Sequence, residues 1–244
     1  MSKLKYLIKK IVYREKASEK DIIDYLRNNG AKIGENVRIW APQKSRIDLS
    51  CPWLLQFGDN VRITEGVVIL THDYSWSVIK KYSSEKIQEG QILGAMSPVT
   101  IGNNVFIGMN AIITRGVTIG DNVIIGAGSV VTKDCESDSV YAGNPAKKIM
   151  TIEEYYNKRK SAQFEEAKTL ALKYYDIFGK KPSKDVFKEY FMLFMNANEA
   201  ENSIKFKKQM ETSGNYSLTM EYMKSNTPMF DDFDTFLNAC FEKE

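Results

Sequence analysis

Residues 101–136 read IGNNVF, IGMNAI, ITRGVT, IGDNVI, IGAGSV and VTKDCE, so an aliphatic residue opens every group of six. Gly or Thr follows each aliphatic residue, and a small or β-branched residue stands four places after the first five of them. A helix repeats every 3.6 residues and a strand every 2, so neither produces a strict period of six. A three-sided coil does, because each six-residue side turns one aliphatic side chain into a shared interior. The stretch therefore predicts a mainly β protein built from hexapeptide repeats.

The same period is present upstream. The residues in phase are Ile33, Ile39, Phe57, Ile63 and Ile69. Ser45 and Cys51 occupy the phase positions between them and fit poorly, so residues 41–56 are expected to form an irregular side. The 32 residues from Ile69 to Ile101 are not a multiple of six, which indicates an insertion. We expect the coil to span residues 31–149, with an inserted loop at 73–98.

Stacked coils need permissive corners and capped ends. Neighbouring strands lie about 4.8 Å apart, so like residues stack on like. The corner sequences G-x-N, G-D-N and G-A-G tolerate unusual backbone angles. A single coil cannot bury its own interior, so the open ends must be covered. Ser18, Asp21 and the stop at Asn29-Gly30 predict a short helix within an N-terminal helical cap, residues 1–30.

Composition excludes several classes of protein. A net charge of +3 over 244 residues does not support nucleic-acid binding. The single histidine, His72, and three separated cysteines exclude a His/Cys zinc cluster, so no metal is expected. Three cysteines also do not suggest a disulfide scaffold, which favours a reducing, cytoplasmic location. Gly126-Ala127-Gly128 lacks the third glycine and the βαβ context of a dinucleotide site, and we interpret it as a corner.

The first sixteen residues carry six basic residues, and their longest uncharged apolar run is three residues, too short for a signal peptide or a membrane span. The apolar positions share one helical face. Such a helix either lies on an anionic membrane surface or packs on its own protein with a solvated basic face. The general pattern favours the second interpretation.

Residues 150–244 lie outside the repeat and are expected to form an α-helical C-terminal extension. Thr151 and Glu154 make a capping box for a helix that runs to Gly179. A second helix is predicted from about Pro182, and residues 196–202 are predicted to be a linker. Docking of a glycosyltransferase or a membrane partner by this extension is a hypothesis.

The run IGNNVFIGMNAIITRGVTIGDNVIIGAGSVVTKD, followed by AGNPAKKI, resembles the hexapeptide-repeat O-acetyltransferases. Within this family it resembles the galactoside and maltose acetyltransferase branch and the acetyltransferases of capsule and lipopolysaccharide gene clusters. The resemblance covers about residues 30–150. It implies a left-handed parallel β-helix, a homotrimer with active sites between subunits, and acetyl-CoA as the donor.

His72 is the candidate catalytic residue. It follows the first run of coils, at the point where the insertion of about 25 residues begins. Transfer of acetyl from a thioester to a hydroxyl needs a base that works near neutral pH, and imidazole suits this role. A lone histidine is by itself more often a surface or satisfied core residue. The resemblance places a catalytic histidine at this point and implies that His72 is the general base. Asp73 and a backbone carbonyl are the two alternatives for the group that orients its ring.

Further site residues follow from the resemblance. It implies contacts to the donor at Met109, Asn110, Ala127, Thr132, Lys133, Lys147 and Lys148. The first three would contact the pantetheine and thioester, and the basic residues would hold the phosphates; the alternative for the lysines is solvated surface charge. In the loop, Tyr74 and Trp76 are suited to stack on a sugar ring, although Trp76 could equally anchor the loop on a neighbouring subunit.

The sequence therefore predicts an acetyl-CoA-dependent O-acetyltransferase that acts on a hydroxyl of a surface polysaccharide or its precursor. Xenobiotic or serine acetyltransferase activity is an alternative within the same fold. A non-catalytic hexapeptide-repeat scaffold or sugar-binding protein is the alternative outside enzymes. A zinc-dependent coil enzyme that needs three histidines is excluded by the single His72.

Overall fold

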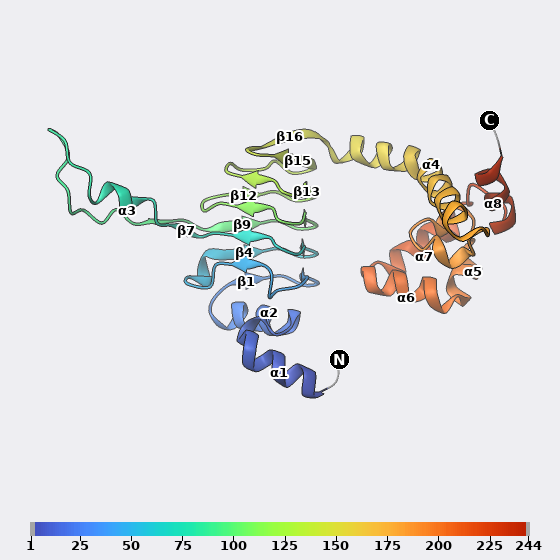
Figure 1. Ribbon diagram of the computed structural model, residues 1–244, viewed down its shortest axis with the longest axis horizontal. Coiled ribbons are helices and arrows are strands. Elements are labelled where there is room, and N and C mark those ends of the chain that lie inside the picture. Colours follow the sequence, from blue (N-terminus) through green and yellow to red (C-terminus); the bar gives the residue numbers. More distant parts are fainter. Residues whose placement is uncertain (1–2, 243–244) are drawn as a thin grey trace. The chain divides into compact units, whose positions relative to one another are not determined.

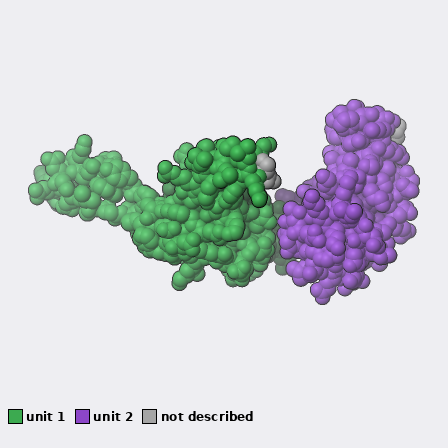
Figure 2. Space-filling model, turned by 90° about the horizontal axis from the view of Figure 1, so that it is seen from below, with its two compact units in different colours: residues 1–155 green, residues 156–244 purple. Residues whose placement is uncertain are grey.

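The computed structural model describes residues 3–242. It divides into two compact units, residues 1–155 and 156–244, coloured green and purple in Figure 2. The first unit contains the hexapeptide repeat and the second is helical. Within residues 3–242, no helix is both long and apolar enough to cross a membrane.

Three parallel sheets form the sides of the coil, whose turns are stacked in Figure 1. The first sheet contains β1 (Lys32–Ile33), β4 (Leu55–Phe57), β9 (Val99–Ile101) and β12 (Thr118–Ile119). The second contains β2 (Arg38–Ile39), β5 (Arg62–Ile63), β10 (Phe106–Ile107), β13 (Val123–Ile125), β15 (Ser139–Gly143) and, antiparallel at its end, β16 (Ala146–Thr151). The third contains β3 (Arg46–Ile47), β6 (Val68–Ile69), β11 (Ile112–Ile113) and β14 (Val130–Val131). The architecture is the one expected for the predicted β-helix.

The registers confirm the period of six. Ile101 pairs with Ile119, Ile107 with Ile125 and Ile113 with Val131, so three six-residue sides complete one turn. The side chains of these ladders are buried at nearly zero exposure. Complete burial of one such side chain stabilises the fold by about 1.5–3 kcal/mol. The aliphatic period therefore supplies both the geometry and the core of the first unit.

Residues 41–56 are irregular, as predicted, and the structure shows which residue of that side points inward. Ile47, and not Ser45 or Cys51, pairs with Ile69 in the third sheet. Two extra residues precede Ile47 and four more follow it before Phe57. The two excesses add up to six residues, which is one repeat unit, so the phase is restored at Phe57. Counting strictly in sixes from Ile39 therefore reaches Ser45 and Cys51 and misses Ile47.

The corners between sheets need backbone angles that asparagine tolerates. The non-glycine corner residues with φ between 54° and 57° are Asn36, Asn60, Asn104, Asn122 and Asp138. Asparagine and aspartate visit the left-handed region more readily than other side-chain-bearing residues. The amides also bond along the stack: Asn104 Nδ2 donates to Asn122 Oδ1 at 2.8 Å. The recurring asparagine thus stabilises both the turn and the stacking of turns.

Two helices lie at the N-terminal end of the coil (Figure 1). α2 (Glu19–Asn28) begins as predicted, since Ser18 Oγ accepts a hydrogen bond from the Asp21 amide at 3.1 Å, and its Ile22 and Leu26 side chains are buried. α1 (Lys3–Tyr13), joined to it by the 3₁₀ turn Arg14–Lys16, buries none of its residues. The expectation that its apolar face packs on the protein is wrong.

The insertion leaves the coil as an arm (Figure 1). β7 (His72–Asp73) and β8 (Ala95–Met96) pair antiparallel at its base, and α3 (Trp76–Ile79) lies beyond them. The Ser97 amide donates to the Thr71 carbonyl at 2.9 Å and closes the loop. Large apolar side chains are exposed along the arm: Tyr74, Val78, Ile79, Tyr82, Ile87, Ile92, Leu93 and Met96.

The second unit has its own core of aromatic and methionine side chains. Its helices are α4 (Ile152–Phe178), which starts in the first unit, α5 (Ala197–Asn202), α6 (Ile204–Ser213), α7 (Tyr216–Ser225) and α8 (Phe233–Phe241). The capping box that starts α4 is confirmed: the Glu154 amide donates to Thr151 Oγ1, and the Thr151 amide donates to Glu154 Oε2.

Two secondary-structure predictions for this unit are wrong. The segment after Pro182 forms only the 3₁₀ turns Lys184–Val186 and Phe191–Leu193, and its Phe187, Phe191 and Phe194 side chains are all buried. The predicted linker at 196–202 is α5. A capping box between Asn196 and Glu199 starts that helix, and its polarity reflects exposure and not disorder.

Candidate functional site

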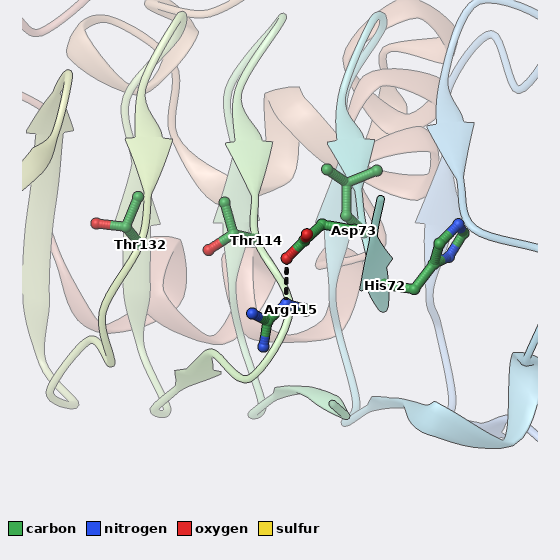
Figure 3. Close-up of a pocket in the computed structure, with 6 residues that line it drawn as sticks. His72, Asp73, Thr114, Arg115 and Thr132 are labelled. Atoms are coloured by element: carbon green, nitrogen blue, oxygen red, sulfur yellow. Dashed lines mark hydrogen bonds and ion pairs between the residues drawn. The ribbon is translucent and has the colours of Figure 1, made fainter. Parts of the chain in front are cut away.

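A pocket of about 320 Å³ opens where the arm leaves the coil. Its lining residues, drawn in Figure 3, are Leu70, His72, Asp73, Thr114, Arg115 and Thr132. Leu70, Thr114 and Thr132 each follow the inward residue of a third-sheet strand, so they stack on successive turns. The strands thus supply one wall of the pocket, and the base of the arm supplies His72.

The imidazole of His72 is held by Asp48. His72 Nδ1 lies 2.6 Å from Asp48 Oδ2. The Asp48 side chain is only 6% exposed, whereas that of His72 is 45% exposed. Asp48 directly follows the inward Ile47 of β3 and therefore lies on the turn next to Leu70. One nitrogen of the ring is thus anchored to a buried carboxylate, and the half-exposed ring lines the pocket.

Asp48 is itself held by several donors. Its Oδ2 accepts hydrogen bonds from Thr71 Oγ1 at 2.6 Å and from the Thr71 amide at 3.2 Å. Its Oδ1 accepts from Ser50 Oγ at 2.6 Å and from the Ser50 amide at 3.0 Å. Burial alone would raise the pKa of Asp48, but the hydrogen bonds from Ser50, Thr71 and His72 outweigh it and hold that pKa well below its ordinary value. An ionised carboxylate at neutral pH fixes the proton of His72 on Nδ1 and leaves Nε2 to accept one.

The two orienting groups predicted for His72 are both wrong. Asp73 turns away from the ring and pairs with Arg115, an ion pair marked in Figure 3. Hydrogen bonds from Ser75 and then Arg115 lower the pKa of Asp73. The orienting group is Asp48, which the sequence reasoning missed. The signal for it was the pair Ile47-Asp48, an aliphatic residue followed by an acid at the position where other turns have Leu or Thr.

The residues predicted to contact pantetheine lie together. Met109 and Ala127 occupy the same corner on successive turns, where the Gly128 amide donates to the Met109 carbonyl at 2.8 Å. Both are exposed. Asn110 continues that corner with φ of 58°, and its side chain reaches over Gly66 of the previous turn. The structure thus brings these three residues into one exposed column.

The polar and basic residues predicted for the phosphates occupy different surroundings. Thr132 lines the pocket, and Lys133 is exposed directly after it. Lys147 and Lys148 lie in β16. Lys148 Nζ is 2.9 Å from Glu136 Oε2, and this partner raises the lysine pKa. A lysine that already has an acidic partner is a weaker candidate for a phosphate than Lys147.

Tyr74 and Trp76 lie in the arm and contact each other. Their ring centroids are 4.7 Å apart in an edge-to-face arrangement, and Lys80 Nζ lies 5.6 Å and 5.3 Å from the two rings. Neither aromatic residue lines the pocket formed by the described residues of one chain. Contact of these rings with an acceptor therefore stays a prediction.

Residues 98–133 match the family described as the hexapeptide repeat of succinyl-transferase. Protein CapG of Staphylococcus aureus is 45% identical over 136 residues, which cover 55% of this chain and 74% of that protein. Among solved structures, galactoside acetyltransferase in complex with coenzyme A is 28% identical, with a TM-score of 0.43, over 61% of this chain and 81% of that chain. The polySia-specific acetyltransferase NeuO is 25% identical, with a TM-score of 0.35, over 49% of this chain, and the chain spans 48% of its length.

The alignment to CapG covers most of that protein at high identity, and the family match falls on the most regular turns of the coil. The family match agrees with the strand registers, which repeat every six residues over the same segment. The chain belongs to the hexapeptide-repeat acetyltransferases.

Proposed function

We propose that this protein is an acetyl-CoA-dependent O-acetyltransferase that acts in the cytoplasm on a saccharide hydroxyl of a surface polysaccharide or its precursor. The observation that carries the proposal is the pairing of His72 with the buried Asp48 at the mouth of the pocket. This is the arrangement of a general base whose tautomer and orientation are set by a carboxylate.

In the proposed reaction, His72 Nε2 removes the proton of the acceptor hydroxyl while its oxygen attacks the thioester carbonyl carbon. The new C–O bond forms, the C–S bond breaks, and the departing thiolate takes the proton from His72. Asp48 stabilises the charged imidazole between these two transfers. General-base catalysis of this kind contributes about 10²–10⁴-fold to the rate.

The surroundings of the cysteines are consistent with direct attack by the acceptor, without a cysteine nucleophile. Cys135 and Cys240 are buried, and burial raises the pKa of their thiols to about 12 and about 11. Such thiols are neither ionised nor reachable at neutral pH. Cys51 lies in the irregular side of the coil and is not among the residues that line the pocket.

The exposed corner column supports the donor site. Met109, Asn110 and Ala127 offer backbone groups along successive turns. Lys133 and Lys147 are proposed to bind the phosphates of CoA as point charges. The similar galactoside acetyltransferase was solved in complex with coenzyme A, which supports the same donor here.

The acceptor and the assembly are proposed from two further observations. NeuO is an acetyltransferase specific for polySia, which supports a saccharide acceptor. One chain supplies an open pocket and an arm with exposed aromatic residues. A homotrimer whose arms contact neighbouring copies would cover both. A docking role of residues 150–244 for a glycosyltransferase stays a hypothesis.

Release of CoA thiol from acetyl-CoA, measured with a panel of mono- and oligosaccharides, tests the proposal. We expect saccharide-dependent release by the wild type and at least a 100-fold lower rate for His72→Ala. Glu35→Ala is the control, since this corner residue is highly exposed and lies outside the pocket. Unchanged turnover of His72→Ala would remove the general base. Turnover only with serine or an antibiotic would identify one of the alternative acceptors, and none with any acceptor would favour a scaffold.

A further inference from the structure

α1 presents an uncovered apolar face. Its apolar residues are Leu4, Leu7, Ile8, Ile11 and Val12, each between 54% and 78% exposed. At 100° per residue these five positions fall within one arc of the helix. An apolar stripe of this kind on a folded protein marks a surface that meets an apolar partner.

The rest of the unit holds this face outward. Tyr6 Oη donates to both carboxylate oxygens of Asp21, at 2.9 Å and 3.0 Å, and Lys10 forms an ion pair with the same carboxylate. Tyr6 and Lys10 lie on the opposite side of α1 from the apolar arc. The polar side of the helix is therefore the one that contacts α2, and the apolar side points away from it.

The charge of α1 indicates what covers the face. The helix, KLKYLIKKIVY, contains four lysines and no acidic residue. Lys3 and Lys5 lie at the two borders of the apolar arc, where they would meet the headgroups of a bilayer into which the arc is inserted. A basic amphipathic helix of this design lies in the interface of an anionic membrane.

A second copy of the chain is a poorer partner for the apolar face of α1. Eleven residues make a helix about 16 Å long, and one face of it is far smaller than the roughly 800 Å² per partner of a stable protein interface. Two such faces would also bring the bordering lysines together, and like charges repel. We propose that the apolar face of α1 binds the surface of an anionic phospholipid bilayer. This inference stands independently of the proposed acetyl transfer.

Flotation of the full chain with vesicles tests the inference. The vesicles are phosphatidylcholine alone, or phosphatidylcholine with phosphatidylglycerol at 3:1. The wild type is expected to bind the anionic vesicles at least tenfold more strongly than the neutral ones, and less strongly as NaCl rises from 0.1 M to 0.5 M. Leu7→Ser with Ile11→Ser is expected to lower binding at least tenfold.

The matched control is Ile204→Ser with Leu218→Ser, which removes two apolar side chains exposed by 86% and 72% on helices of the second unit, and is expected to bind as the wild type does. Lys3→Gln with Lys9→Gln is expected to reduce binding to anionic vesicles only. Because Leu7 and Ile11 are exposed, the melting temperature of the Leu7→Ser, Ile11→Ser variant should be unchanged.

Failure of the wild type to bind anionic vesicles, or equal binding by the Leu7→Ser, Ile11→Ser variant, would overturn the inference. A lower solution mass of that variant, measured by light scattering, would also overturn it, because the face would then join copies of the chain. Thiol release with a soluble acceptor reports on the acetyl transfer separately, and it should be the same in this variant as in the wild type.

Discussion

At the residue scale, the proposed chemistry rests on a carboxylate that is almost fully enclosed. Asp48 accepts hydrogen bonds from Ser50 on its own turn and from Thr71 on the next turn. It also holds His72 through Nδ1. An enclosed carboxylate keeps its charge only when such donors surround it. The same donors fix its position, so the imidazole has one orientation relative to the pocket.

Asp48→Asn is expected to lower kcat by about 10²–10⁴-fold, because an amide favours the wrong tautomer of the ring while leaving the shape of the site intact. The KM for acetyl-CoA should change little, since Asp48 contacts His72 and none of Met109, Asn110 and Ala127 in the exposed corner column. Steady-state kinetics at several acetyl-CoA concentrations separate the two effects, with Asp176→Asn, an exposed change in α4, as the control. A rise in KM with unchanged kcat would contradict a positioning role.

The lowered pKa of Asp48 also predicts a pH dependence of stability. Above about pH 5, well above the unfolded pKa of an aspartate, native and unfolded chains both carry the charge, and the full stabilisation is present. As pH falls further, the unfolded chain takes up the proton first, so stability is lost progressively until pH passes the lowered native pKa. Asp48→Asn cannot titrate and should lose less stability between pH 5 and pH 3. Melting temperatures across that range test this, and parallel curves for the two proteins would refute it.

At the element scale, the three sheets differ in the residue that follows each inward side chain. In the first sheet it is always glycine: Gly34, Gly58, Gly102 and Gly120. In the third sheet it is never glycine: Asp48, Leu70, Thr114 and Thr132. The glycines of the first sheet have no side chain at this position, so successive turns stack closely there. The residues of the third sheet place a row of side chains along one edge of the coil, and the pocket lies at that edge.

Gly102→Ala tests the close stacking. A Cβ at this position would lie 2.4 Å from Asp121 Oδ1 and 2.8 Å from the Gly120 backbone, so the turns must move apart. We expect destabilisation of about 1–3 kcal/mol, or several degrees in melting temperature. Gly94→Ala in the arm is the matched control, since its Cβ would meet nothing within 4 Å. Equal effects of the two substitutions would argue against the stacking explanation.

At the scale of the whole molecule, the first unit has surfaces that a single copy does not cover. The arm exposes apolar side chains along its length, and the pocket has one wall from the third sheet. In a trimer about an axis parallel to the coil, each arm could cover a neighbouring copy. The three α1 helices would then lie at one end of the assembly, where weak individual binding to a membrane becomes strong through avidity.

The solution mass is therefore expected to be about three times the 27.9 kDa of one chain. Replacing the outer part of the arm, residues 75–94, by a short glycine linker should lower both the mass and the rate of thiol release. The hydrogen bond between Ser97 and Thr71 closes the base of the arm and should survive this change. Light scattering after gel filtration measures the mass. A wild type that elutes with the mass of one chain at micromolar concentration would disprove the assembly.

The amino-acid sequence was enough to predict the coil, its phase on both sides of the insertion, the cap at Ser18 and the position of His72 at the base of the arm. A period of six constrains the backbone locally, residue by residue, so it can be counted. The period did not reveal Asp48, because six extra residues around Ile47 shift the count and then restore it. The exposed surface of α1 likewise depends on tertiary contacts. An amphipathic pattern shows that a helix has two faces, but the contacts of Tyr6 and Lys10 with Asp21 decide which face meets the protein.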